Sequence, residues 1–421
     1  MSSGHHHDPH PLRPTTKVLT EGFDPTLSVG SARPAVFRSS TYVFPSPEAA
    51  ERAFDIATGR AQVAAGESTD LIYARFNHPN AQILEEQILN LEPGAHAALA
   101  FNSGMAAIMT SLFALLRPGQ SVVYTVPIYG GTQHFIQDHL SKWGVSGIPV
   151  LSGRGDLLAR AIHSAKDLGA VLLETPANPT LVMTDIRQAC QAAASRKLSP
   201  GETRPPVLVD NTLLGPTFQH PLALGADLAV YSGTKYLSGF SDMLAGIVLA
   251  ADPELLGKIR PARGLFGNIL QPDECWMLGG RLPTVTLRMN RASKNAQRIA
   301  EHLAQHPKLK RVLYPTLFTD PEQKRIYAEQ CDFPGAMFSI ELHGGKKEAF
   351  DFLRNLHIAR NAVSLGGVET LACHPKTTTH SGFTEQESAT AGITDGLVRV
   401  SIGIEHWRDL LEDFEQSLAA V

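Results

Sequence analysis

A lysine that follows two small hydroxyl residues is the feature of this sequence with the clearest chemical potential. The stretch Tyr231–Gly239 follows an apolar run and contains Ser232, Thr234 and Lys235. Hydroxyl groups in such a loop can hold a phosphate, and an unprotonated lysine amine forms a Schiff base with an aldehyde. Pyridoxal 5′-phosphate (PLP) joins these two groups and usually pairs its lysine with an aspartate at the pyridine nitrogen. Asp210 ends the preceding apolar run, although this stretch alone also fits an ordinary surface lysine.

Composition narrows the classes of protein to which this chain can belong. The chain has 421 residues, of which 43% are hydrophobic, and this length predicts two or three domains with large cores. A net charge of −4 gives no sign of nucleic-acid or membrane partners. The four cysteines lack CxxC spacing, so neither a disulfide framework nor a metal site is indicated. Without an apolar leader or an apolar run of membrane-spanning length, we expect a soluble, cytoplasmic protein.

A short histidine cluster near the start of the chain has no assigned function. His5, His6 and His7, with His10 nearby, have side chains that bind metals. We interpret the cluster as an artificial tag or a disordered arm, because the surrounding segment is polar and rich in proline.

The pattern of apolar residues divides the chain into three parts. Residues 1–77 lack regular periodicity apart from a helix at 47–57, and an arm this long usually packs on another part of the assembly, often another subunit. Residues 78–283 alternate helices with short β-branched strands, which is typical of a large α/β domain whose mostly parallel sheet is covered on both faces. Residues 284–421 predict a smaller α+β domain, which opens with a long one-sided helix from 285 to 303 and includes a half-buried strand at 396–405.

Several polar residues directly follow the predicted strands of the large domain. Because ligands on such sheets bind beyond the carboxyl ends of the strands, these residues are expected to converge. They are Ser103–Gly104, Tyr129, Asn178, Asp210 and Lys235.

Four segments of the chain resemble one enzyme family. They are Glu174–Pro179, Val209–Thr212, Tyr231–Gly239 and Gly396–Ser401. In this order they are similar to the PLP-dependent enzymes of Cys/Met metabolism, which include cystathionine γ-synthase, cystathionine γ-lyase and methionine γ-lyase. The resemblance covers roughly residues 20–421. It implies the aspartate-aminotransferase fold (PLP fold type I), PLP as cofactor, and a homotetramer built from two catalytic dimers.

The resemblance also implies which residues bind the cofactor. Lys235 matches the Schiff-base lysine that moves protons, and Asp210 matches the carboxylate that keeps the pyridine nitrogen protonated. Tyr129 matches the ring that stacks on the cofactor and acts as acid and base at the departing group. The catalytic residues are thus Lys235 and Tyr129. The residues expected at the phosphate are Ser232, Thr234, Gly104 and Met105, with Tyr73 and Arg75 from the arm of a neighbouring subunit.

The substrate is expected to be a small amino acid held by its α-carboxylate. Arg399 resembles the residue that binds this carboxylate through two parallel hydrogen bonds. The other residues expected at the substrate are Ser364, Asn178, Tyr73 and Val363.

Apolar residues on the substrate side favour a short thioether or thiol. Ile72 and Val363 are apolar where cystathionine γ-lyases carry acidic residues, and His134 stands where those enzymes often have arginine. A distal ammonium and carboxylate would be left unpaired there, at about 1–3 kcal/mol or more each. The segments 362–366 and 369–375 resemble methionine γ-lyase more than the sulfhydrylases of the family. We therefore predict γ-elimination from a methionine- or homocysteine-type amino acid, which yields 2-oxobutanoate, ammonia and a thiol.

Two departures from the methionine γ-lyase pattern leave other reactions open. Those enzymes typically have a reactive cysteine at the position of Gly131 and a Lys-Asp pair at the position of Arg263–Gly264. The alternatives are γ-replacement on an activated homoserine ester, as in cystathionine γ-synthase, and cystathionine γ-lyase activity. A protein that binds PLP without catalysis is a further alternative, and the complete set of cofactor-site residues argues against it.

Overall fold

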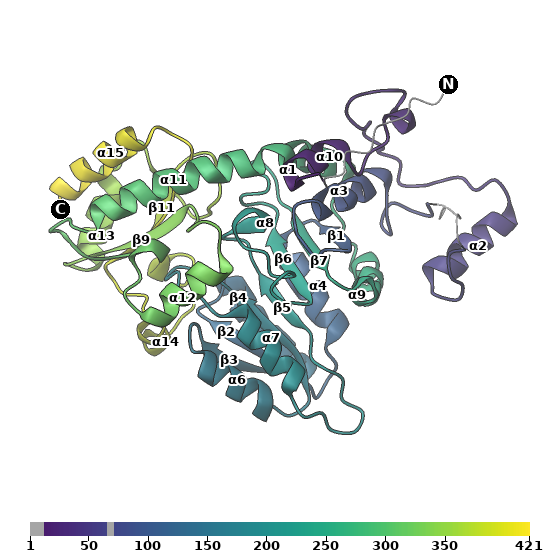
Figure 1. Ribbon diagram of the computed structural model, residues 1–421, viewed down its shortest axis with the longest axis horizontal. Helices are drawn as coiled ribbons and strands as arrows, with labels where there is room; N and C mark the ends of the chain where they lie inside the picture. Colours follow the sequence, from purple (N-terminus) through teal and green to yellow (C-terminus); the bar gives the residue numbers. More distant parts are fainter. Residues whose placement is uncertain (1–11, 65–70) are drawn as a thin grey trace.

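Two β-sheets form the framework of the structure, a computed structural model that describes residues 12–64 and 71–421. In these ranges the larger sheet has seven strands in the order β1-β7-β6-β5-β4-β2-β3, and the smaller has five in the order β10-β11-β12-β9-β8. The long helix α11 (Val285–Leu303) extends from the side of the large sheet to the small one (Figure 1). The histidines at positions 5–7 and 10 lie outside the described residues.

The strands and helices have the following bounds. The large sheet consists of β1 (Ala97–Phe101), β2 (Ser121–Val126), β3 (Ser146–Leu151), β4 (Leu168–Glu174), β5 (Val207–Asp210), β6 (Leu228–Ser232) and β7 (Gly246–Ala250). The small sheet consists of β8 (Leu309–Leu313), β9 (Met337–Leu342), β10 (Arg360–Asn361), β11 (Leu371–Cys373) and β12 (Leu397–Ser401). The other helices are α1 (Pro14–Thr20), α2 (Pro47–Ala57), α3 (Pro79–Leu89), α4 (Gly104–Leu115), α5 (Gly130–His134), α6 (Gly155–Ser164), α7 (Ile186–Ser195), α8 (Gly215–Phe218), α9 (Pro253–Phe266), α10 (Pro272–Arg281), α12 (Pro321–Gln330), α13 (Lys346–Asn355), α14 (Glu385–Thr390) and α15 (Trp407–Ala419). Short helical turns are η1 (Pro25–Ser28), the π-helical η2 (Phe135–His139), η3 (Leu140–Trp143), η4 (Leu282–Thr284), η5 (Pro315–Leu317) and η6 (Pro375–Thr377).

The large sheet is parallel except at one strand, which confirms the predicted α/β layout. Strands β3, β2, β4, β5 and β6 pair in parallel, whereas β7 is antiparallel to both β6 and β1. All strands but β7 therefore end at the same edge, and β7 begins there. This edge receives the loops that carry the residues expected to do chemistry.

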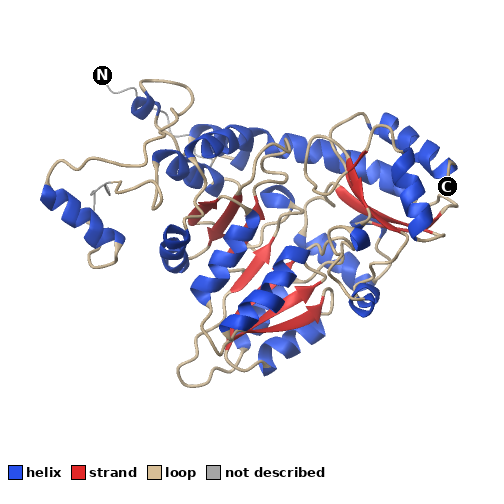
Figure 2. Cartoon of the chain, turned by 180° about the vertical axis from the view of Figure 1, so that it is seen from behind, coloured by secondary structure: helices blue, strands red, loops and turns tan. Residues whose placement is uncertain are grey.

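Helices cover both faces of the large sheet, and neighbouring residues of a strand point to opposite sides (Figure 2). In β5, Val207 and Val209 join the core that includes α6 and α7, while Leu208 joins the core under α4 and α9. Because both faces are dry, the strands are apolar without interruption rather than alternating.

The small sheet corrects one prediction. The strand expected to be half-buried, β12, is buried at every position, including Arg399 and Ser401. It lies between β11 and β9 in the middle of the sheet, and its polar residues have partners from other segments. The alternation of charge and apolar residues therefore marks a buried site and not a solvated face.

The N-terminal arm contains more helix than its composition predicts. Helix α2 has the predicted bounds, but α1 was not expected, because a helix of seven residues leaves too short a periodic signal. Figures 1 and 2 both draw α2 apart from the body of the molecule.

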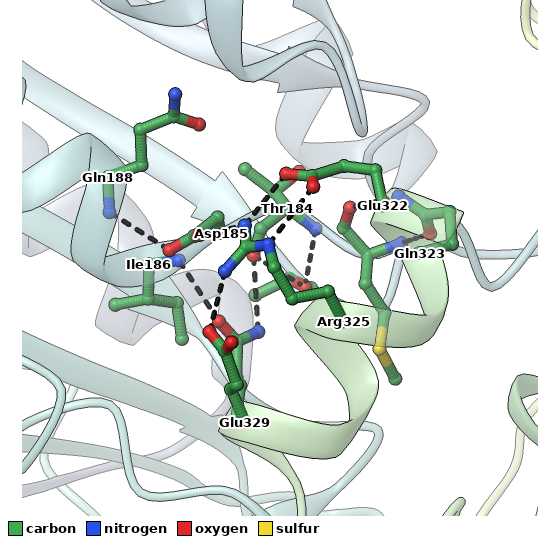
Figure 3. A network of polar contacts seen from close by, with 11 residues as sticks. Thr184, Asp185, Ile186, Gln188, Glu322, Gln323, Arg325 and Glu329 are labelled. Atoms are coloured by element: carbon green, nitrogen blue, oxygen red, sulfur yellow. Dashed lines mark hydrogen bonds and ion pairs between the residues drawn. The ribbon is translucent and has the colours of Figure 1, made fainter. Parts of the chain in front are cut away.

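Helix α12 ties the C-terminal part of the chain to the segment before α7 (Figure 3). Gln323 makes two hydrogen bonds with the backbone of Met183, one donated by Met183 N–H over 2.7 Å and one accepted by its carbonyl over 2.9 Å. Arg325 donates to Asp185, the N-cap of α7, over 2.6 Å. The side chains of one helix thus act as hydrogen-bond partners for an otherwise irregular backbone.

Candidate active site

A cavity of about 550 Å³ lies at the edge where the parallel strands end. Its wall combines residues from that edge with residues of the C-terminal part of the chain. The residues that line it are Ser103, Gly104, Met105, Ile108, Tyr129, Gly131, Glu174, Asn178, Asp210, Thr212, Leu213, Ser232, Thr234, Lys235, Leu244, Val363, Ser364, Leu365, Thr378, Thr379 and Arg399. The expected convergence of the strand-end residues is thus present in the structure.

Lys235 lies in a turn just after β6 and points into this cavity. Its Nζ donates a hydrogen bond to Ser364 Oγ over 2.9 Å. Burial, and then the positive charge of Arg399, lower the pKa of Lys235 from 10.5 to about 8. An amine with this pKa is neutral for a substantial fraction of the time near physiological pH, which is the form that attacks an aldehyde.

The lowered pKa of Lys235 predicts the pH dependence of covalent cofactor capture. Because the reactive amine forms as pH rises through about 8, the rate at which cofactor-free protein captures PLP should rise up to that pH and then level off. An ordinary lysine would give a rate that keeps rising toward pH 10.5. Stopped-flow absorption at each pH measures this rate. In an Arg399→Gln variant, which lacks the nearby positive charge, the plateau should move to higher pH; an unmoved plateau contradicts the assigned cause.

Asp210 is buried at the end of β5 and is held by Thr212. Its Oδ1 accepts hydrogen bonds from the hydroxyl and the N–H of Thr212, over 2.6 and 3.1 Å. Burial nevertheless raises the pKa of the Asp210 carboxyl, because these two bonds do not replace its lost hydration. Such a carboxylate is stabilised by a cationic N–H partner, which a pyridinium nitrogen provides. The Thr212 hydroxyl also accepts the N–H of Ser232 over 2.8 Å, so it links the ends of β5 and β6.

The N-terminus of α4 forms one end of the cavity. Ser103 caps the helix by accepting the N–H of Ala106 over 3.1 Å, and the first-turn N–H groups at Gly104 and Met105 have no acceptor within the helix. A Cβ at position 104 would lie 2.8 Å from Ser232 Cβ, so glycine alone lets this helix approach the end of β6. Helix N–H groups beside hydroxyl groups are the chemistry that binds a phosphate dianion.

Arg399 is buried and faces the same cavity from β12. Its NH1 donates to Asn178 Oδ1 over 3.2 Å, and its NH2 donates to the Ser364 carbonyl over 2.7 Å. Ser364 has a φ of 105°, which is rare for a residue with a side chain, so packing holds it in an unfavourable conformation. The Nε of Arg399 has no hydrogen-bond partner among the described residues. An unpaired, buried guanidinium N–H beside the cavity fits a carboxylate ligand.

Tyr129 and Gly131 lie together at the mouth of the cavity. Tyr129 is 44% exposed, and its N–H donates to Glu174 Oε2 over 2.7 Å. A Cβ at position 131 would lie 2.7 Å from Cε1 of the Tyr129 ring. A side chain at position 131 is therefore incompatible with this placement of the ring, and the tyrosine occupies that space.

Some predicted site residues do not line the cavity of their own chain, and some lining residues were not predicted. Tyr73 and Arg75 lie in the arm, where Arg75 donates to the carbonyl of Gly264. His134 is exposed and pairs with Asp138, and Ile72 is also outside the wall. Ser103 was expected at the site but had no stated role there, and the lining residues that were not predicted are Ile108, Gly131, Glu174, Thr212, Leu213, Leu244, Leu365, Thr378 and Thr379. Glu174 and Thr212 fall within the quoted motifs, so their place beside strand ends was a usable signal.

Comparison with known proteins identifies the family. The sequence profile of the Cys/Met metabolism PLP-dependent enzymes matches residues 15–419. The chain belongs to this family. It is 38% identical to L-methionine gamma-lyase of Pseudomonas putida over 96% of this chain and 97% of that protein. It is also 38% identical to cystathionine beta-lyase of Bacillus subtilis, over 83% of this chain and 86% of that one. The solved structure of cystathionine gamma synthase from Xanthomonas oryzae pv. oryzae in complex with cystathionine has a TM-score of 0.87 at 33% identity, covering 98% and 99% of the two chains.

The family depends on PLP, and the cavity fits this cofactor. The wall offers a lysine with a lowered pKa for the aldehyde, a buried carboxylate for the pyridine nitrogen, and a helix N-terminus with hydroxyl groups for the phosphate. The predicted fold (PLP fold type I), cofactor and family are confirmed, whereas the role of each site residue stays a prediction.

Proposed function

We propose that this chain is a PLP-dependent carbon–sulfur lyase that performs γ-elimination on a short sulfur amino acid such as methionine or homocysteine. One observation supports this choice of substrate above all. Among the described residues, the charged members of the cavity wall are Glu174, Asp210, Lys235 and Arg399, and each has a partner or a role at the cofactor or the α-carboxylate. On the substrate side, Val363 and Leu244 present apolar surface. A short thioether satisfies such a wall, and a distal amino-acid end does not.

Three acidic residues line the adjoining outer cavity among the described residues, and each accepts a hydrogen bond. Asp242 pairs with Arg281, Glu274 accepts the N–H of Gln271, and Glu369 accepts the hydroxyl of Ser241. Of these three, only Asp242 is thus paired with a cation, so it is the inner wall, where Val363 and Leu244 are apolar, that disfavours cystathionine.

The residues of this chain divide the work of the reaction as follows. PLP, when bound, withdraws electrons from the substrate carbon chain. Arg399 and Asn178 bind and orient the α-carboxylate. The amine of Lys235 removes the proton at Cα and later the one at Cβ. The Tyr129 hydroxyl gives a proton to the sulfur as the Cγ–S bond breaks. One proton then returns to Cγ and one to Cβ, and hydrolysis with water releases 2-oxobutanoate and ammonia.

A substrate panel tests the proposed function against its alternatives. We expect 2-oxobutanoate from L-methionine and L-homocysteine without any added thiol. Release from cystathionine should be at most slow, because the inner wall at Val363 and Leu244 offers its distal end no charged partner. Release of 2-oxobutanoate is measured with each substrate. O-Succinyl-L-homoserine is added with and without cysteine, and there the formation of cystathionine and succinate is measured as well. If only the ester with cysteine turns over, cystathionine γ-synthase-type γ-replacement is correct. If no substrate changes the visible absorption of the bound cofactor, the chain is a PLP-binding protein without catalysis.

We also propose that the arm, residues 1–77, contacts a neighbouring subunit of a homotetramer in the cytoplasm. Tyr73 and Arg75 do not line the cavity of their own chain, and α2 stands apart from the body of the molecule (Figure 1). A second copy would give both features a function, and the mass of the particle in solution tests the assembly.

The proposed boundaries of the two domains that follow the arm are 78–283 and 284–421. None of the helices in residues 12–64 and 71–421 combines the length and the apolar character needed to cross a bilayer.

A further inference from the structure

We propose that Glu174 is a positioning residue whose carboxylate holds Tyr129 and Asn178 at a set distance from each other. The inference rests on the proposed function, because it concerns how the departing group and the α-carboxylate are held in one geometry. Glu174 itself has no part in the division of work described above.

The carboxylate of Glu174 joins two loops at the edge of the large sheet. Glu174 is the last residue of β4 and is only 4% exposed. Its Oε2 accepts the N–H of Tyr129 over 2.7 Å, and its Oε1 accepts the N–H of Asn178 over 3.2 Å. Its own N–H donates to Thr125 Oγ1 over 3.0 Å, so its backbone is anchored to β2. One side chain therefore positions the loop after β2 and the loop after β4.

Each of these loops carries a group that acts on the substrate in the proposed reaction. Tyr129 stands at the departing sulfur, and the Asn178 side chain accepts a hydrogen bond from Arg399, which binds the carboxylate. The two loops belong to different strands, and the sheet ladder between β2 and β4 has its last paired residues at Tyr124 and Leu172. Beyond that point the Glu174 carboxylate is a direct link between them.

The segment that starts at Glu174 is held independently at its other end. Figure 3 shows Gln323 and Arg325 of α12 bound to the segment around Thr184 and Asp185. Gln330 also accepts the N–H of Ile186 over 3.1 Å. Because α12 keeps this far end in place, loss of the Glu174 hydrogen bonds should displace the loops at the cavity and leave the fold intact.

The two backbone N–H groups at Glu174 favour an ionised carboxylate with one accepting oxygen for each. Burial, and then the negative charge of Asp210, raise the pKa of Glu174 to about 8, so the experiment is made above that pH, where the carboxylate predominates. Each oxygen accepts one backbone N–H, whereas glutamine offers one accepting oxygen and one donating NH₂ group. A Glu174→Gln substitution keeps the volume but leaves one N–H facing another donor in a buried place. Asp413 provides a matched control: it is buried and accepts the N–H groups of His357, Ile358 and Ala359 over 2.7 to 2.9 Å, outside the wall of the cavity.

The experiment compares Glu174→Gln with Asp413→Asn as PLP-loaded enzymes on two substrates. L-methionine loses a thiol, which needs a proton from Tyr129, whereas O-acetyl-L-homoserine loses acetate, which leaves as an anion. We expect kcat/KM of Glu174→Gln for methionine to fall about 10- to 100-fold, the range of one lost hydrogen bond to a charged group. The fall for the ester should be clearly smaller, and Asp413→Asn should keep the wild-type ratio between the two substrates. Unchanged kinetics, or an equal fall for both substrates, overturns the proposal.

A measurement without turnover separates this proposal from the proposed function. If wild-type enzyme releases no 2-oxobutanoate from either substrate, the lyase function fails, and visible circular dichroism of the bound cofactor then decides the role of Glu174. The Tyr129 ring is expected to stack on the cofactor, so Glu174→Gln should change this band while Asp413→Asn leaves it unchanged. Identical bands in all three proteins overturn the proposal. If Glu174→Gln does not fold, Glu174→Asp, which retracts the carboxylate by one methylene group, takes its place in both assays.

Discussion

Replacement of Lys235 by alanine is expected to lower the release of 2-oxobutanoate from L-methionine on the order of 10³-fold or more. The substitution removes the amine that holds the cofactor aldehyde and also the base that reaches Cα. Among the residues that the structure describes, the cavity wall offers no second lysine, and its other cation, Arg399, stays protonated in proteins. Turnover is measured by the rate of 2-oxobutanoate formation in the presence of excess PLP.

A chemical rescue distinguishes this loss from misfolding. Added methylamine should restore part of the activity of Lys235→Ala, because a small amine can enter the space that the side chain left. Lys324→Ala serves as the control, since Lys324 is an exposed lysine of α12, and it should behave as wild type. If Lys235→Ala retains more than about a tenth of wild-type turnover, the assignment of the lysine is wrong. Loss of a general base typically lowers the rate at least about 100-fold.

Replacement of Arg399 by lysine should raise KM for methionine and lower kcat/KM about 100-fold, the order of loss for a truncated buried charge pair. Lysine keeps the positive charge but cannot form two parallel hydrogen bonds to a carboxylate. It would also leave Asn178 Oδ1 or the Ser364 carbonyl without its present donor. Steady-state kinetics with methionine measure the effect.

The charge and the geometry of Arg399 can be tested separately. Arg399→Lys should leave the pH plateau of PLP capture near 8, because the positive charge beside Lys235 remains. Arg399→Gln should shift that plateau and also raise KM. A variant that shifts the plateau without any change in KM would show that Arg399 acts on the lysine and not on the substrate.

The strands of the large sheet and the buried side of α11 were predictable because they depend on local sequence patterns. Continuous apolar runs predicted short buried strands within residues 78–283, and all seven strands of the large sheet lie there. In α11 the predicted one-sided stripe of Val285, Met289, Ala292, Ala296, Ile299 and Leu303 is buried throughout. Such periodicity arises from which side of a single element meets the core, so neighbouring residues contain the signal.

Other features depend on contacts that no local pattern contains. The strand β12 was predicted as half-buried, yet Arg399 is buried because Asn178, 221 residues away in the sequence, and Ser364 accept its N–H groups. The roles of Thr212 and Glu174 also went unnoticed, since each depends on hydrogen bonds to a neighbouring strand or loop. A polar residue in an apolar strand looks the same in sequence whether it meets water or a distant partner.

The sequence by itself determined the family, the cofactor and the residue types of this site, because a few motifs at strand ends specify that chemistry. Only the tertiary structure decided how those residues are tuned: the lowered pKa of Lys235, the space that Tyr129 takes from position 131, and the double hydrogen bond at Glu174. The physical reason is that pKa shifts and close approaches arise from burial and from neighbours in space. Burial of this kind exists only once distant segments have packed together.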